Sequence, residues 1–296
     1  MRSIRIPFLI DLKRVDSEPD IRAMAQDQRI DRYFVSRGPL VNRLLAGRVS
    51  DALRVDGKPL PSVAPRGDAE RARSQAALHK RLDPTKGPLW DDETLGRLVA
   101  AVRGSASADT IGPVAQQAVG RLFNKNYVGD AESFEAAKDL DDAVRTFNPI
   151  RLFKLKLLGQ LRRSRRLLTE RVNGDLAGVH GTGVAVHNIV HGLEHMRELW
   201  RKEPRPTTEE AVRACLFAPQ RVLRQATAKG GTLAGEVRPG TLVLLELEKA
   251  REVSPNAETV FMAGTWAECP AGAFVAALLR AVWDGALASE AAEKRP

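Results

Sequence analysis

The stretch Phe261-Met-Ala-Gly264-Thr-Trp-Ala-Glu-Cys269-Pro-Ala-Gly272 contains the most specific pattern in the chain. It places a cysteine just before residues 273–288, whose apolar spacing is that of an amphipathic helix. A thiol at the start of a helix lies near backbone N–H groups and the positive end of the helix dipole, which lower its pKa and favour the thiolate. Glycines let the backbone approach a ligand closely. Cys269 is therefore either a thiolate ligand or a free thiol on a loop.

The chain before this stretch changes from helical to strand-like spacing. The sequence Thr207-Thr-Glu-Glu210 predicts the start of a helix, because a Thr is followed by acidic residues in the next turn. Glu210 and Arg213 are three residues apart on that helix, so they share a face and are expected to form an ion pair. Short strands separated by glycine and Pro-Gly turns are expected at residues 221–226, 232–237 and 239–247.

A long helix is expected between Gly174 and Trp200, because the chain reaches Glu203-Pro204 soon afterwards. Its first half contains the sequence Ala177-Gly178-Val179-His180-Gly181-Thr182.

This order of long helix, short helix, strands, cysteine loop and final helix resembles the C-terminal part of a cytochrome P450. The resemblance covers residues 174–288 and implies a mainly α fold with a small β-sheet, a reduced cytochrome P450-like fold. It also implies haem b as cofactor, with the iron bound by the Cys269 thiolate. Glu210 and Arg213 would be the family's structural pair, and Arg224 would bind a haem propionate. The cofactor loop would further include Phe261, Gly264, Trp266 and Gly272.

Several residues depart from the family pattern. His180 occupies the place of the acid on the long helix, and Gly181 occupies the place of the oxygen-activating alcohol, whereas Thr182 is retained. Phe261 precedes Cys269 by one position more than in the family. The basic residue expected between Gly264 and the cysteine is absent, and Trp266 is nearest its place, so one propionate contact is in question.

These departures favour a peroxide-driven reaction over reductive activation of dioxygen, because the family's acid and alcohol deliver the protons that dioxygen needs. His180 and Thr182 are the catalytic candidates, and a histidine that titrates near neutral pH suits a general acid or base. The leading hypothesis is a monooxygenase, peroxygenase or hydroperoxide-rearranging enzyme acting on a small apolar substrate, with peroxide or a redox partner. The alternatives are a non-catalytic haem sensor or degenerate paralogue, and a membrane-surface or nucleic-acid binder without cofactor.

Four of the five histidines lie on one face of the expected long helix. Besides His180, which the resemblance directs to the distal side of the haem as an acid, base or iron ligand, they are His187, His191 and His195. These three form either a polar stripe or a metal site, but one helix rarely supplies a whole ligand set.

The composition restricts the class of protein further. The 296 residues carry 46 Lys and Arg against 37 Asp and Glu, a net charge of +9. Much of this charge lies on an expected basic helix at residues 151–171, which fits a solvated face, or an anionic membrane surface, better than a nucleic acid. With only Cys215, expected to be buried, and Cys269, a disulfide scaffold is excluded and a cytoplasmic location is expected. We expect no membrane-spanning helix.

The first part of the chain carries no functional motif. Pro- and Gly-rich loops are expected to separate short helices near residues 68–81, 91–103, 109–125 and 131–147. We therefore predict a single haem domain over residues 1–296, in which residues 1–173 form an N-terminal helical part and residues 174–288 the haem-binding core.

Overall fold

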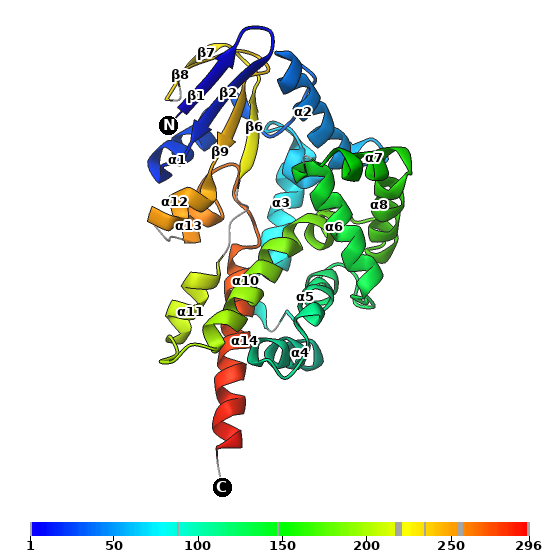
Figure 1. Cartoon of the computed structure of the whole chain (residues 1–296), viewed down its shortest axis with the longest axis vertical. Coiled ribbons are helices and arrows are strands. Elements are labelled where there is room, and N and C mark those ends of the chain that lie inside the picture. The colour runs from blue at the N-terminus through cyan, green and yellow to red at the C-terminus, as the bar shows by residue number, and fades with distance from the viewer. Residues whose placement is uncertain are drawn as a thin grey trace. The chain divides into compact units, whose positions relative to one another are not determined.

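Segments far apart in the sequence fold together into two units, whose elements are labelled in Figure 1. The computed structural model describes residues 2–87, 89–146, 148–216, 221–233, 235–253 and 257–294. The first unit comprises Met1–Ala76, Ala143–Phe147 and Ala218–Cys269, and the second comprises Ala77–Asp142, Asn148–Phe217 and Pro270–Pro296. The chain passes between units several times, and the single haem domain over residues 1–296 remains a prediction.

The first unit is built on a five-stranded sheet with the order β1-β2-β9-β6-β3. The β2 and β9 strands are parallel, and the other neighbours are antiparallel. The strands β1, β2, β9 and β6 lie side by side in Figure 1. The strand bounds are β1 Arg2–Ile6, β2 Ile10–Val15, β3 Ile30–Asp31, β6 Val222–Ala226 and β9 Leu242–Leu245.

Short elements complete this unit. The two-stranded sheets pair β4 Arg54–Val55 with β5 Lys58–Pro59, and β7 Gly230–Thr232 with β8 Gly235–Val237. The helices are α1 Glu18–Gln26, α2 Leu40–Ala52, η1 Pro61–Val63, α12 Leu247–Val253, α13 Ala257–Val260 and the first part of α3 Ala69–Arg81.

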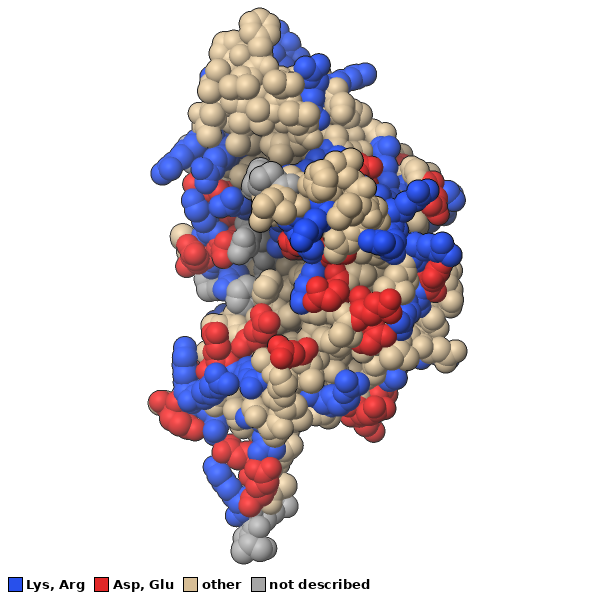
Figure 2. Space-filling view, turned by 45° about the vertical axis from the view of Figure 1, so that its right-hand side comes forward, with Lys and Arg blue, Asp and Glu red and all other residues tan. Residues whose placement is uncertain are grey.

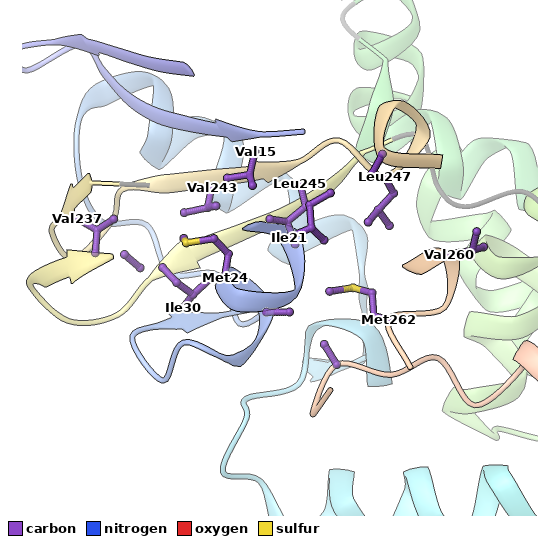
Figure 3. Packing of buried hydrophobic residues seen from close by; sticks show 14 residues of the cluster. Val15, Ile21, Met24, Ile30, Val237, Val243, Leu245, Leu247, Val260 and Met262 are labelled. Atoms are coloured by element: carbon purple, nitrogen blue, oxygen red, sulfur yellow. The ribbon is translucent and has the colours of Figure 1, made fainter. Parts of the chain in front are cut away.

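One hydrophobic cluster joins the sheet to α1, α12 and the cysteine loop (Figure 3). Val15, Val243 and Leu245 come from adjacent strands, while Ile21 and Met24 come from one face of α1. Met262 and Ala267, from the cysteine loop, are buried in the same cluster. The burial of these apolar side chains therefore fixes the base of the cysteine loop against the sheet.

The strands expected at residues 221–226 and 239–247 are confirmed as β6 and β9, whereas the strand expected at 232–237 is divided between β7 and β8. In the first 60 residues, α1 and α2 agree with the helical expectation, but the strands there were not predicted. The β1 and β2 strands form a hairpin there, and β2 pairs with β9 from the far end of the chain. Every residue of β1 is exposed, so this strand lacks the buried apolar face that marks a strand in sequence. The β2 strand pairs with a distant partner, β9, and β1 pairs with β2, so strand pairing rather than local propensity makes these segments strands.

Gly240 allows two loops of the first unit to approach closely. Its φ is +92°, and a Cβ atom built on it would lie 2.5 Å from the carbonyl carbon of Arg37 and from the nitrogen of Gly38. The buried Asn42 amide donates to the carbonyl oxygen of Gly240 at 2.8 Å. Only a residue without a side chain therefore fits between these backbones.

We expect Gly240→Ala to lower the free energy of unfolding by roughly 3 kcal/mol or more, through the positive φ and the backbone clash together. The matched control is Gly57→Ala, because Gly57 also has a positive φ, +79°, but open space around its Cβ position. The free energy of unfolding of the control should fall by only about 1 kcal/mol. Urea unfolding measures both, and equal losses would show that the close approach at Gly240 contributes nothing.

The second unit is helical. Its central helix is α10 Val186–Trp200, which contacts α4 Asp92–Arg103, α5 Ile111–Gly120, α11 Thr208–Cys215 and α14 Gly272–Glu293. The other elements are η2 Pro84–Lys86, η3 Ala108–Thr110, α6 Ala131–Arg145, α7 Pro149–Leu157, α8 Gln160–Arg171, α9 Leu176–His180 and the π-helical turn η4 Gly181–Ala185. These helices confirm the expected helical segments between residues 91 and 147, with shorter bounds for α5.

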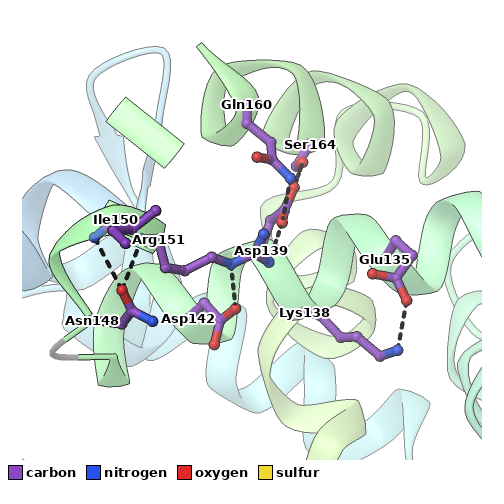
Figure 4. Close-up of polar contacts among 9 residues, drawn as sticks. All are labelled: Glu135, Lys138, Asp139, Asp142, Asn148, Ile150, Arg151, Gln160 and Ser164. Atoms are coloured by element: carbon purple, nitrogen blue, oxygen red, sulfur yellow. Dashed lines mark hydrogen bonds and ion pairs between the residues drawn. The ribbon is translucent and has the colours of Figure 1, made fainter. Parts of the chain in front are cut away.

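The expected basic helix over residues 151–171 is two helices, α7 and α8, separated at Gly159 with a φ of +65°. Asp139 on α6 joins them (Figure 4). Its carboxylate accepts hydrogen bonds from Arg151 at 2.7 Å, Gln160 at 3.0 Å and Ser164 at 2.6 Å. Arg151 also pairs with Asp142 at 2.7 Å. Part of the positive charge of this segment is therefore used inside the fold.

The α14 helix is long and apolar enough to cross a membrane by length and composition, which differs from the expectation of no such helix. One of its faces is packed into the second unit, where Phe274, Leu278 and Trp283 are buried. The Trp283 ring packs edge to face against the Trp200 ring of α10, with 5.4 Å between the ring centroids. These contacts bury one face of α14 in the second unit.

Asp91 provides a pH-dependent contact in this unit. Its carboxylate caps α4 by accepting from the Thr94 amide at 2.8 Å, and it pairs with Arg121. Burial acts to raise the pKa of Asp91, but the hydrogen bonds from Thr94 and Arg121 outweigh it and lower the pKa to about 2. A carboxyl group whose pKa is lower in the folded protein stabilises the fold above its unfolded pKa and loses this effect on protonation.

We expect Asp91→Asn, which can still cap the helix, to lower the free energy of unfolding by about 1 kcal/mol at neutral pH, since Asp91 is partly exposed. This difference should disappear as the pH falls from about 4 to about 2. Urea unfolding across that pH range measures it, with the neighbouring exposed Asp92→Asn as control. A pH-independent difference would rule out the charge as its cause.

Candidate functional site

The cysteine loop is held by its own backbone and by α1 and α3. The Cys269 N–H donates to the carbonyl oxygen of Phe261 at 2.8 Å, which closes the loop. Met262 and Gly264 have positive φ values of 53° and 71° within it. These two turns accommodate the additional residue between Phe261 and Cys269. Cys269 itself is exposed at the end of the loop, three residues before the first residue of α14, Gly272.

Trp266 is the centre of a cluster of cations. The guanidinium groups of Arg71, Arg66 and Arg32 lie 4.5, 4.9 and 5.2 Å from the centroid of its ring. Its indole N–H donates to the carbonyl oxygen of Ala25, and its own carbonyl oxygen accepts from Arg71 Nη2 at 2.9 Å. The position that lacks the expected basic residue therefore gathers arginines from other elements around an aromatic ring.

Arg224 on β6 belongs to the same group of buried cations. Its side chain is 6% exposed, and its contacts include the Leu223 carbonyl oxygen at 2.9 Å and the Met262 sulfur at 3.8 Å. Burial and the charge of Arg71 lower the pKa of Arg224 to about 10, against a smaller opposite effect of Asp31. Burial and the charges of Arg224 and Arg71 likewise lower the pKa of Arg32 well below its usual value, while Cys269 and Asp31 act to raise it.

The buried arginines exceed the acidic charge near them. Asp31 already accepts hydrogen bonds from the backbone N–H groups of Arg32, Tyr33 and Arg66, at 2.6, 3.2 and 3.0 Å. Within the described residues, the Nε atoms of Arg32 and Arg224 are buried without a hydrogen-bond acceptor. Buried charges and donors are costly unless they are paired. The cluster therefore fits an anionic ligand bound near Cys269.

The expected ion pair between Glu210 and Arg213 has a different form. The Glu210 carboxylate accepts hydrogen bonds from the N–H and the hydroxyl of Thr207, each at 2.8 Å. These bonds belong to a capping box at the start of α11. The Glu210 carboxylate is exposed. Its pKa is lowered mainly by the hydrogen bonds from Thr207 and to a smaller extent by the charge of Arg213. Among the ion pairs of the described residues, none joins the two side chains, so the predicted direct contact is wrong. The helix start signalled by Thr207 is confirmed.

The long helix expected over residues 174–200 is confirmed, with an interruption at the motif itself. Regular helix ends at His180, a π-helical turn occupies Gly181–Ala185, and α10 continues from Val186. A π-turn changes the direction of the side chains that follow, and such turns are frequent at functional sites. Because the turn lies between His180 and His187, the regular spacing assumed for the four histidines does not hold across it.

Thr182 is fully buried in the second unit. Its hydroxyl donates to the Gly178 carbonyl oxygen at 2.8 Å, and its carbonyl oxygen accepts from the Gln116 amide at 3.0 Å. The Thr182 side chain therefore stabilises the π-turn. At Gly181, a Cβ atom would lie 3.1 Å from a methyl carbon of Val119 and 3.4 Å from the Phe123 ring. The place of the family's alcohol is thus closely surrounded by other side chains.

The remaining histidines have ordinary surroundings. The His187 ring packs against the Phe134 ring, with 5.7 Å between the ring centroids. His191 Nδ1 lies 3.2 Å from the carboxylate of Glu194, one turn later, and His195 Nδ1 lies 3.3 Å from that of Glu198. Within the part of the chain that the structure describes, no group of three or more His, Cys, Asp or Glu side chains could hold a metal ion. This arrangement matches the polar stripe rather than the metal site. Cys215 is buried, as expected.

The structure brings together Cys269, Phe261, Gly264, Trp266 and Arg224 in the first unit. His180 and Thr182 belong to the second unit. Sequence reasoning missed Arg32 after β3 and Arg71 on α3, since neither lies in a motif. Chemically, the first unit offers a thiol on a fixed loop and a set of buried cations for a ligand that carries anionic groups.

No protein-family model and no curated protein matches the sequence. Comparison with solved structures gives matches over almost the whole chain. With P450 RauA, complexed with a biosynthetic intermediate of aurachin RE, the TM-score is 0.62 and the identity 14%, and the match covers 96% of this chain and 85% of that chain.

Two further structures agree. Cytochrome P450-153 from Novosphingobium aromaticivorans gives a TM-score of 0.59 at 14% identity, over 92% of this chain and 81% of that one. A myxobacterial cytochrome P450, CYP267B1, in complex with myristic acid gives 0.56 at 16% identity, over 97% of this chain and 85% of that one.

Proposed function

The chain has the cytochrome P450 fold, and on that premise we propose that it is a haem-thiolate oxidoreductase of an apolar organic substrate. It uses peroxide or a hydroperoxide rather than electrons from a reductase. The observation that carries the proposal is the group of buried cations, Arg32, Arg71 and Arg224, around the loop that ends in Cys269.

The residues present fit haem b. Its two propionates are carboxylates, which suit the unsatisfied buried Nε atoms of Arg32 and Arg224. Arg71, fixed on the Trp266 carbonyl oxygen, supplies the cation that the family has on the cysteine loop itself. Cys269 supplies the thiolate ligand. When bound, a thiolate-ligated haem supplies the oxidising chemistry of oxygen insertion or hydroperoxide rearrangement.

The helix motif supports the choice of peroxide. The Thr182 hydroxyl donates to the Gly178 carbonyl oxygen, and Gly181 has no side chain, so neither supplies the relay to dioxygen. A peroxide already contains reduced oxygen and needs only one group to move a proton. We assign that role to His180, because histidine is the side chain that most often serves as a general acid or base.

The test is turnover of fatty acids or similar apolar compounds by the haem-loaded protein, with hydrogen peroxide or with a reductase system and NADPH. We expect product with peroxide alone, and a rate about 100-fold lower in His180→Gln, with loss of the pH dependence that a histidine gives. His191→Gln, an exposed histidine on α10, is the control. Product only with the reductase would overturn the peroxide proposal.

A second candidate, a haem-binding sensor or degenerate paralogue, is favoured by the same loss of the alcohol and by the engaged Thr182 hydroxyl. It predicts haem binding without product in either system. His180→Ala should then change the ferric spectrum, because His180 would bind the iron.

Partners and location follow from these proposals. Cys215 and Cys269, which are not joined in a disulfide, fit a cytoplasmic location. On α7, exposed apolar residues such as Phe153 alternate with Lys154 and Lys156, which supports an anionic membrane surface as a partner of segment 151–171. A cofactor-free membrane-surface or nucleic-acid binder is the alternative that absence of bound haem would favour.

A further inference from the structure

The turn between β1 and β2 forms an exposed apolar surface in the first unit. Phe8 at the turn is 94% exposed, and Leu44 on α2 is 66% exposed. We call the six exposed apolar residues here the hairpin tip: Ile4, Ile6, Phe8, Leu9, Leu40 and Leu44. Single exposed apolar side chains are ordinary, but a contiguous group of this kind marks an interaction site.

The backbone of the turn fixes Phe8 in its outward position. Phe8 has a φ of 59°, a left-handed conformation that is strained for a large side chain. The carbonyl oxygens of Phe8 and Leu9 accept hydrogen bonds at 2.9 Å from the N–H groups of Leu40 and Val41, at the start of α2. Such strain persists only where the surrounding structure determines the conformation. The apolar side chain is therefore presented by a clamped turn.

Unpaired positive charge surrounds the hairpin tip. Arg2, Arg5, Arg37 and Arg43 are exposed, and none has an acidic partner within the described residues. Residues 1–10 and 32–50 contain no Asp or Glu. In Figure 2, the surface at the top, where the hairpin lies, is tan with blue side chains at its border and no red ones.

We propose that the hairpin tip docks the protein on an anionic lipid surface. Arg5 lies on β1 and Phe8 lies three residues later in the turn, so their Cα atoms are at most about 10 Å apart. Interfacial protein segments bury their apolar side chains about 5–10 Å into the boundary of headgroups and acyl chains. When Phe8 is inserted to that depth, the long Arg5 side chain can extend its guanidinium group to the lipid phosphates. The spacing of apolar and cationic groups thus matches the profile of the bilayer surface.

The charge and shape of the hairpin tip disfavour the other occupants. A second copy meeting it across a two-fold axis would bring unpaired arginines together, which repel. A protein partner would have to supply a pocket for a side chain that projects from a convex turn, whereas acyl chains accommodate it without one. An anionic bilayer therefore fits both the apolar apex and its cationic border.

The experiment is co-sedimentation of the full-length protein with vesicles of phosphatidylcholine alone or with phosphatidylserine. We expect binding to the anionic vesicles that weakens with salt, and binding at least about tenfold weaker for Phe8→Ser combined with Ile6→Ser. Arg5→Gln and Arg43→Gln should each weaken it roughly fivefold. Val253→Ser, which removes an apolar side chain that is 88% exposed on α12, is the matched control and should bind as the wild type does.

A second measurement locates the contact. In Phe8→Trp, the tryptophan emission should shift to shorter wavelength with anionic vesicles and be quenched by brominated acyl chains. Absence of wild-type binding to anionic vesicles, or equal binding by all variants, would overturn the proposal. So would a dimer in size-exclusion chromatography that Phe8→Ser converts to monomers, because a second copy would then be the occupant.

Discussion

Replacing Cys269 by serine is expected to abolish the long-wavelength absorption band that the reduced carbon monoxide complex of a thiolate-ligated haem shows. Cys269 is the exposed thiol at the end of the cysteine loop, and serine does not provide a thiolate. Haem should still bind, since the buried arginines are unchanged. Its absorption should move to the position typical of haem proteins without a thiolate ligand, and product formation should fall below detection.

Cys215→Ser is the matched control for this prediction. Cys215 is buried on α11, so its replacement can lower stability but leaves the spectrum unchanged. A wild-type protein that already lacks the thiolate band, or a Cys269→Ser protein that keeps it, would refute Cys269 as the iron ligand.

Arg224→Met should change haem affinity and stability in opposite directions. The guanidinium is buried among other cations, and its pKa is lowered to about 10. Without an anionic ligand, methionine of similar length should therefore raise the free energy of unfolding, on the order of 2 kcal/mol. The same change removes a propionate partner, so haem affinity should fall at least about tenfold, the effect of one charge-assisted hydrogen bond.

The two effects are measured separately. Urea unfolding of the haem-free protein gives the stability, and the rate of haem transfer to apomyoglobin gives the loss of affinity. Arg43→Met, which removes an exposed arginine of the same unit, should alter neither. If Arg224→Met lowers stability and affinity together, the arginine serves the fold and the anion-site interpretation fails.

Local signals in the sequence predicted the helices well. The capping box at Thr207 and the N-cap at Asp91 fix the starts of α11 and α4, because a cap depends on residues within one turn. The cysteine loop and β6 were likewise predicted, since they lie in recognisable motifs. In contrast, β2 was missed because its partner β9 lies over 200 residues away, and β1 was missed because it is exposed along its whole length and pairs only with β2.

The parts of the candidate site that the sequence did not predict also depend on contacts between distant segments. Arg32 and Arg71 are cationic residues whose burial depends on how distant elements pack around Trp266, and an arginine in a charged sequence is usually exposed. The π-turn at Gly181–Ala185 depends on tertiary contacts such as that between Gln116 and Thr182. The capping role of Glu210 was visible in the sequence, but the family motif suggested a different partner.

The arrangement around Trp266 also makes this residue a natural optical reporter. The chain has four tryptophans, and the other three, Trp90, Trp200 and Trp283, belong to the second unit. With those three replaced by phenylalanine, the emission would come from one indole in contact with three guanidinium groups. Any anion that moves these groups would change the brightness of that emission, so titrations of the cation cluster could be followed by fluorescence without a label.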